Sequence, residues 1–278
     1  MKFLYFNKLI LNINKDVCHK SLLFSSEFLK KRYFKVCHLL LIGIISIPVL
    51  ADDIEHVRFK ESQWDSRILR ILIEGPLRLD SSLEFGISPP PTNNSDITKH
   101  ELEILKGYQR QGRSPVQIAK IKREATSGAF VDMFLGDSVV PKKLAKMARN
   151  ILLLADRECQ YFVVNYKKRF ARPRPSQLAP SLSLVVSNPG HAAYPSGHAT
   201  QSMLMASIIS LIDSDNKLRY FSYARAIAKR REIAGVHYPS DSLSGQQLAM
   251  GILNALMENT DFKAELARVT LRYSQRDE

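Results

Sequence analysis

The chain has 278 residues, of which 45% are hydrophobic and 24% charged. This composition is typical of a globular protein and excludes a disordered, collagen-like or multi-span membrane chain. The 40 Lys and Arg residues against 27 Asp and Glu give a net charge of +13, which permits nucleic acid, an anionic membrane surface or a phosphorylated substrate as partner.

The first 51 residues carry a charge pattern of their own, with eight Lys or Arg and two Asp or Glu. An uncharged apolar run, Leu39–Leu50, follows this basic segment, and Val49 and Ala51 supply the small residues of a cleavage site. We therefore predict that residues 1–51 are a signal peptide, cleaved after Ala51, for export to the periplasm or the medium. The run is shorter than the about 20 residues of a membrane span, and an uncleaved N-terminal anchor is the alternative.

Cysteine usage fits export without disulfides. Cys18 and Cys37 lie in the predicted signal peptide, so the mature chain would keep only Cys159 and form no internal disulfide. Cys159 falls on an apolar helical face, which indicates a packed thiol.

Helical periodicity dominates the sequence after residue 52. In the clearest case, residues 140–171, apolar side chains recur every three or four positions. This helix must end near Ala171, because Arg172 and Arg174 each precede a proline. Further helices are expected at residues 64–75, 98–111, 115–135, 197–213, 217–235, 240–258 and 261–275. The sequence predicts an all-α fold, with one helical bundle domain over residues 52–278.

The first cluster of candidate functional residues lies at residues 167–175. Lys167 closes the long helix, and Arg174 follows on an extended segment, so the two cations could fold toward one point. Arginine offers a planar fork to phosphate oxygens, and lysine offers a point charge. The alternative is a solvated basic helix end, which the helix dipole favours.

The second cluster is Pro195-Ser196-Gly197-His198, a turn before a strongly apolar helix. Ser196 is a natural N-cap, and the backbone N–H groups of Gly197 and His198 would face an anion at the helix start. Gly197 lets that anion approach without a Cβ in the way, and His198 beside it could donate a proton. A capped helix with an incidental histidine is the alternative.

The third cluster lies at residues 230–241. Arg231 shares a stripe with Ala224 and Ile227, and a cation that points inward needs a partner, either a phosphate or an internal carboxylate. Asp241 follows His237 by four residues. A carboxylate on one imidazole nitrogen fixes the tautomer and leaves the other nitrogen free to attack. The alternative is an aspartate that caps the next helix near a satisfied histidine.

Together the clusters supply three cations, an anion site, a nucleophile with its orienting acid, and a proton donor. This inventory suits phosphoryl transfer through a phosphohistidine. No metal is expected, because three fixed cations can do what a divalent ion does elsewhere, and zinc-like Cys/His spacing is absent after residue 52.

The clusters resemble the tripartite motif of the type 2 phosphatidic acid phosphatase superfamily, which includes bacterial class A non-specific acid phosphatases and vanadium haloperoxidases. The family pattern Lys-x6-Arg-Pro, Pro-Ser-Gly-His and Ser-Arg-x5-His-x3-Asp is matched at residues 167–175, 195–198 and 231–241. In one departure, Arg230 stands where the family has a serine, so no contact of that hydroxyl is available.

The resemblance implies that His237 is the nucleophile, that Asp241 orients it, and that His198 protonates the leaving group. It implies phosphoryl contacts from five residues: Lys167, Arg174, Ser196, Gly197 and Arg231. It further implies the helical fold of this superfamily and a metal-independent phosphomonoesterase that acts on phosphorylated small molecules, needs no cofactor and binds vanadate as a phosphate mimic.

Competing functions remain at this stage. No membrane span is expected after Ala51, which favours a water-soluble phosphate ester as substrate over a lipid phosphate at the membrane surface. A vanadate-dependent haloperoxidase is a second alternative, because it would use the same pocket. A non-catalytic protein that binds nucleic acid or lipid headgroups is a third class, but nucleic acid is not an expected partner without a dense basic helix or an aromatic platform. His191 is expected on a loop surface rather than in the cleft.

Overall fold

A computed structural model describes residues 52–126 and 130–275, all of which fall in one compact unit, Pro48–Glu278. The predicted signal peptide, its cleavage position at Ala51, and the cysteines Cys18 and Cys37 lie outside the described residues.

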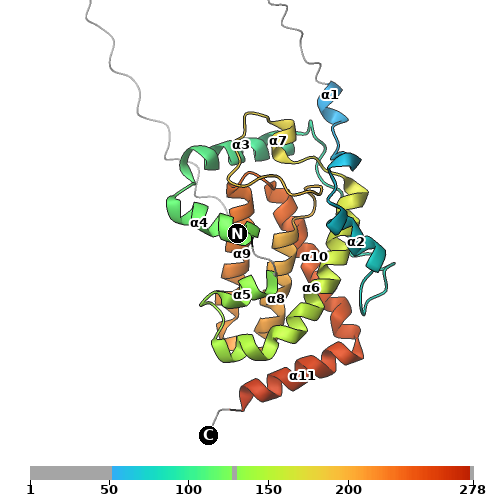
Figure 1. Cartoon of the computed structure of the whole chain (residues 1–278), viewed down its shortest axis with the longest axis vertical. Helices are drawn as coiled ribbons and strands as arrows, with labels where there is room; N and C mark the ends of the chain where they lie inside the picture. The colour runs from blue at the N-terminus through green and yellow to red at the C-terminus, as the bar shows by residue number, and fades with distance from the viewer. Residues whose placement is uncertain (1–51, 127–129, 276–278) are drawn as a thin grey trace, which may run out of the picture. The chain divides into compact units, whose positions relative to one another are not determined.

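The described part of the chain consists of helices and loops without a β-strand, which confirms the all-α fold (Figure 1). In chain order the elements are α1 (Asp52–Glu55), η1 (Glu61–Gln63), α2 (Ser66–Glu74), α3 (Asp96–Gln111), α4 (Pro115–Thr126), α5 (Phe130–Gly136), α6 (Lys142–Phe170), α7 (Pro175–Leu178), α8 (Gly197–Ile212), η2 (Ser214–Asn216), α9 (Lys217–Ile233), α10 (Pro239–Glu258) and α11 (Thr260–Ser274). None of these helices combines the length and apolarity needed to cross a bilayer.

The predicted helices agree with the structure except over residues 115–135. Two helices stand there in place of one, because α4 ends at Thr126 and α5 begins at Phe130. Thr126 is a weak helix former, and residues 127–129 lie outside the described residues.

The core forms around α8, which packs against α6, α9 and α10. The α6 stripe predicted from periodicity is buried, including Leu144, Ile151, Ala155, Phe162 and Tyr166. Cys159 belongs to this stripe and has no exposed surface, and burial raises the pKa of its thiol. It is the packed thiol that the sequence predicts.

Two glycines allow close approaches near the candidate residues, one in a turn and one in a helix. Gly235 follows α9 with φ +82°, and a Cβ there would lie 3.0 Å from a methyl of Leu184, so the turn toward His237 requires glycine. A Cβ on Gly245 of α10 would lie 2.6 Å from the carbonyl oxygen of Ser196. Ser196 also donates its backbone N–H to the carbonyl of Asp241 at 2.9 Å. The start of α10 is thereby held against the start of α8.

Candidate active site

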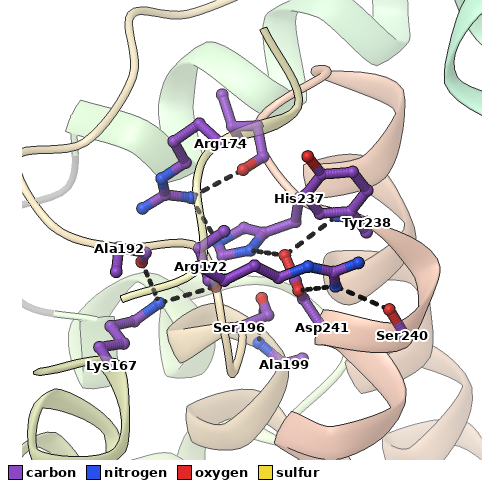
Figure 2. Close-up of polar contacts among 12 residues, drawn as sticks. Lys167, Arg172, Arg174, Ala192, Ser196, Ala199, His237, Tyr238, Ser240 and Asp241 are labelled. Carbon is purple, nitrogen blue, oxygen red and sulfur yellow. Dashed lines mark hydrogen bonds and ion pairs between the residues drawn. The ribbon is translucent and has the colours of Figure 1, made fainter. Parts of the chain in front are cut away.

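The predicted nucleophile and its orienting acid are in contact at the start of α10. Nδ1 of His237 lies 3.0 Å from Oδ2 of Asp241, and the same oxygen accepts the backbone N–H of Tyr238 at 3.0 Å (Figure 2). Because a carboxylate only accepts, Nδ1 carries the proton and Nε2 keeps its lone pair. Both side chains are buried.

Arg172 completes the surroundings of Asp241. Its Nη1 donates to Oδ1 of Asp241 at 2.6 Å, and its Nη2 donates to Glu101 of α3 at 3.1 Å. The guanidinium also lies 3.8 Å from the ring centroid of Tyr238. Glu101 in turn accepts the backbone N–H of Ser240 at 2.5 Å. A cation therefore occupies the second oxygen of the buried Asp241 side chain, and such pairing offsets part of the cost of burying a carboxylate.

Arg174 lies on the other side of the His237 ring. Its Nη1 is 3.1 Å from Nε2 of His237 and donates to the carbonyl of Val236 at 2.7 Å (Figure 2). Its Nε and Nη2 donate to the carbonyl of His191, and Nη2 also donates to Nδ1 of His191 at 2.9 Å. The prediction that His191 lies on a loop surface is therefore wrong, because the histidine helps to hold Arg174 in the site.

Lys167 reaches the same region from the last turn of α6. Its Nζ donates to the carbonyls of Ala192 at 2.8 Å and Ala193 at 2.9 Å, in the loop before α8 (Figure 2). Burial, and secondly the charge of Arg174, lowers the pKa of this ammonium well below its usual value. Lys167 and Arg174 are thus close enough to repel each other, in agreement with the prediction that the chain turns at the helix end and brings the two cations together.

Arg231 approaches from the last turn of α9 and is 2% exposed. Among the residues that the structure describes, neither its Nε nor its Nη1 has a hydrogen-bond partner. Its charge also contributes to lowering the pKa of His237, behind burial, Arg174 and Lys167. None of Lys167, Arg174 and Arg231 forms an ion pair with a carboxylate of the described residues. Buried cations without acidic partners make a site that favours an anion.

The start of α8 has the predicted cap. Ser196 is the N-cap, its hydroxyl oxygen accepts from the backbone of Ala199 at 3.4 Å, and its O–H can still donate to a ligand. A Cβ on Gly197 would meet only ordinary contacts, 3.6 Å from Val163 and 3.9 Å from Gln201. The protein itself does not demand a glycine there, so the missing Cβ leaves room for a ligand at the helix start.

His198 lies in the first turn of α8 and is half-buried. Its Nε2 lies 3.3 Å from the backbone carbonyl of Glu124 in α4, and its ring packs edge-on against Phe130 at 5.2 Å between centroids. Because a carbonyl only accepts, Nε2 carries a proton and Nδ1 is the nitrogen left for chemistry.

Arg230, the departure from the family motif, pairs with a carboxylate of α4. Its Nε and Nη2 contact Oε1 of Glu124 at 2.7 and 2.6 Å, and both side chains are buried. The residue that replaces the family serine is therefore an ion-pair partner of α4.

Electrostatics keep the imidazoles of the site neutral. Burial is the largest cause that lowers the pKa of His191, His198 and His237 well below the usual value, and nearby cations lower it further. For His237 these cations are Arg174, Lys167 and Arg231, in that order. A neutral imidazole is the form that can attack phosphorus.

The structure places all eight predicted site residues at one end of the bundle, where α6 and α9 end and α8 and α10 begin. Sequence reasoning missed Arg172, Glu101 and Glu124. Arg172 stood in the predicted Arg-Pro-Arg-Pro segment, and its place before a proline was the only signal. Within residues 52–126 and 130–275, no group of three or more His, Cys, Asp or Glu side chains is arranged to hold a metal ion.

Comparisons with known proteins point to one family. Residues 150–264 match the family model of the PAP2 superfamily. The chain is 25% identical over 200 residues to a non-specific acid phosphatase of Salmonella typhi, an alignment that covers 67% of this chain and 78% of the relative.

Two solved structures are also similar. A bacterial vanadium-dependent iodoperoxidase shares 19% identity with a TM-score of 0.51, which supports the fold; 65% of this chain is covered, but only 55% of the peroxidase. A transmembrane PAP2-type phosphatidylglycerolphosphate phosphatase from Bacillus subtilis shares 18% identity with a TM-score of 0.46, over 60% of this chain and 87% of the other.

Proposed function

We propose that this chain, whose residues 150–264 match the PAP2 superfamily model, is a phosphatase that hydrolyses phosphate monoesters through a phosphohistidine on His237. The observation that carries this proposal is the group of three buried cations beside His237 that lack acidic partners, above all Arg231 with two unpaired nitrogens. A monoester dianion supplies the missing negative charge and places phosphorus next to Nε2.

In the first step, the lone pair on Nε2 of His237 attacks phosphorus. The bond from phosphorus to the alcohol oxygen breaks, and this oxygen takes a proton from Nδ1 of protonated His198. In the second step, His198 takes a proton from water through Nδ1, and the resulting hydroxide attacks phosphorus. The P–N bond breaks, orthophosphate leaves, and Nε2 regains its lone pair.

Asp241 and the cations act on charge in both steps. Asp241 stabilises the positive charge that His237 acquires while phosphorus is bonded to Nε2. Lys167, Arg174 and Arg231, with the O–H of Ser196 and the backbone N–H of Gly197, would bind the phosphoryl oxygens as their charge shifts. The bound dianion also raises the pKa of His198, which burial and Arg231 otherwise lower, and so supplies the proton donor that the first step needs.

Metal independence follows from this use of fixed cations. Activity of the purified protein should survive dialysis against EDTA, and orthovanadate should compete with substrate. Loss of activity to the chelator and its recovery on addition of a divalent metal would contradict the mechanism.

The deciding experiment measures release of inorganic phosphate, without added metal, from a panel of aryl and alkyl monoesters, nucleotides and lipid phosphates. We expect release from water-soluble monoesters and its loss in His237→Ala. Preference for lipid phosphates in vesicles would point instead to action at the membrane surface. Halide oxidation with added vanadate and peroxide would favour a haloperoxidase, whose fold this chain resembles. No turnover, with salt-sensitive binding that survives His237→Ala, would favour a non-catalytic role.

We also propose export by cleavage after Ala51, with residues 52–278 as the mature helical domain. The charge and hydropathy pattern of residues 1–51 supports this, as does the similarity to an acid phosphatase. N-terminal sequencing of the protein from a periplasmic fraction should begin at Asp52. Full-length protein that stays with the membrane would support an uncleaved anchor.

A further inference from the structure

Helix α4 contacts the site through Glu124, which belongs to none of the three motifs. The carboxylate of Glu124 pairs with Arg230 at 2.6 and 2.7 Å, and its backbone carbonyl accepts from Nε2 of His198 at 3.3 Å. One residue of α4 therefore contacts α9 through its side chain and α8 through its main chain.

The ion pair is almost completely buried, with side-chain exposures of 7% for Arg230 and 0% for Glu124. Burying two charges costs about as much free energy as their attraction returns, so such a pair contributes little to stability, while breaking it is costly. What the pair does provide is a fixed distance between α4 and the end of α9.

The geometry points to Glu124 and Arg230 as positioning residues for His198. Their ion pair holds α4 where the Glu124 carbonyl keeps a proton on Nε2 of His198, so that Nδ1 is the nitrogen that gives and takes the transferable proton. This inference rests on the proposed function, because His198 needs a defined tautomer only if it transfers protons. Arg230 replaces a serine too short to reach α4 in this way, so the device is a feature of this chain.

A second contact limits the freedom of the His198 ring. Phe130, at the start of α5, makes a T-shaped contact with the ring at 5.2 Å between centroids, so the imidazole contacts both the Phe130 ring and the α4 carbonyl. If α4 moved away, the aromatic contact alone would still hold the ring, but nothing would select the protonated nitrogen. The expected defect is therefore a wrong tautomer rather than a displaced histidine.

The test uses Arg230→Ser, which restores the family residue and leaves the Glu124 carboxylate unpaired. General-acid help matters most for esters with poor leaving groups. We expect kcat/KM for alkyl phosphates to fall at least about tenfold further than kcat/KM for p-nitrophenyl phosphate, as in His198→Ala. A merely structural role would lower both values equally.

Two further variants keep the test decisive. Glu124→Met/Arg230→Met replaces the ion pair with apolar side chains of similar length, so it should fold even if Arg230→Ser does not, and it should show the same leaving-group defect. Tyr220→Phe is the matched control, because it removes a buried hydrogen bond to Asp213 at the opposite end of α9 and should change neither ratio.

Nitrogen NMR of the His198 ring gives a readout that does not depend on turnover. We expect the Nε2–H tautomer alone in the wild-type protein and a mixture in Arg230→Ser and in the double variant. An unchanged tautomer, or an unchanged ratio of alkyl to p-nitrophenyl kcat/KM in an active folded variant, would overturn the inference. If the wild-type protein has no phosphatase activity, the proposed function fails, and the tautomer measurement still decides whether the ion pair sets the His198 proton.

Discussion

Nη1 of Arg174 lies 3.1 Å from Nε2 of His237, the nitrogen that Asp241 leaves free. A guanidinium only donates, so this contact occupies the lone pair that would attack phosphorus. In the protein without substrate, the proposed nucleophile His237 is therefore blocked by Arg174, a cation that the proposed mechanism uses to bind the substrate. A phosphoryl group that takes over the hydrogen bonds of Arg174 would therefore bind and unmask His237 in one event.

This arrangement predicts that the shape of Arg174 matters as well as its charge. Arg174→Lys keeps one positive charge but loses the fork that contacts His237, Val236 and His191 together. We expect kcat/KM for p-nitrophenyl phosphate to fall by about tenfold to a hundredfold, with weaker inhibition by vanadate. Arg169→Lys, at an exposed pair with Glu84, is the control and should be neutral. Equal activity of the two variants would argue against phosphate contact by Arg174.

Stability is predicted to fall in acid. Burial and nearby cations lower the folded-state pKa of His191, His198 and His237. In the unfolded chain, a histidine has a pKa of about 6.5. Below that pH the unfolded chain binds protons that the histidines of the folded protein do not bind. The contribution of these histidines to folding stability is therefore complete above about pH 6.5 and is lost as the pH falls toward their folded-state pKa values.

Melting temperatures measured between pH 7 and pH 5 should fall by about 5 °C or more. Orthophosphate should restore part of the loss, because a bound anion favours the charged imidazoles. Potassium chloride at equal ionic strength is the control. A melting temperature that does not change over this range, with or without phosphate, would show that these histidines do not resist protonation.

Arg172 is predicted to be the most costly charge to remove. Arg172→Met leaves Asp241 and Glu101 as buried carboxylates without their shared cation. We expect a loss of about 3–5 kcal/mol in the free energy of unfolding, measured by urea titration. Arg149→Met removes an exposed partner of Asp132 and should cost no more than about 1 kcal/mol. Similar small losses in both variants would mean that the Arg172 network does not hold Asp241.

Much of the fold and the site follows from local sequence. The α6 stripe, the end of α6 before Arg172, the N-cap at Ser196 and the four-residue step from His237 to Asp241 each depend on neighbours along the chain. Short-range geometry fixes such features, so periodicity and residue type suffice to predict them. The division of residues 115–135 into α4 and α5 was not predicted, because apolar residues continue to recur at helical spacing in both segments.

The missed residues depend on contacts between distant segments. Arg172 acts on Asp241 only because α3 brings Glu101 to its other side, and Glu124 reaches His198 only because Arg230 holds α4. His191 was assigned to the surface because nothing in its neighbours indicates that Arg174 folds back onto it. Charges paired across 69 or more residues have no local signature.

The most direct measurement is the fate of phosphate during turnover. The reaction with a labelled monoester is quenched rapidly without acid, and the label is located by peptide mapping. We expect an acid-labile, base-stable phosphoryl group on Nε2 of His237. This group should be absent in His237→Ala and should accumulate in His198→Ala, in which its hydrolysis is slower. Wild-type turnover with the label on another residue, or persistent turnover in His237→Ala, would contradict the account.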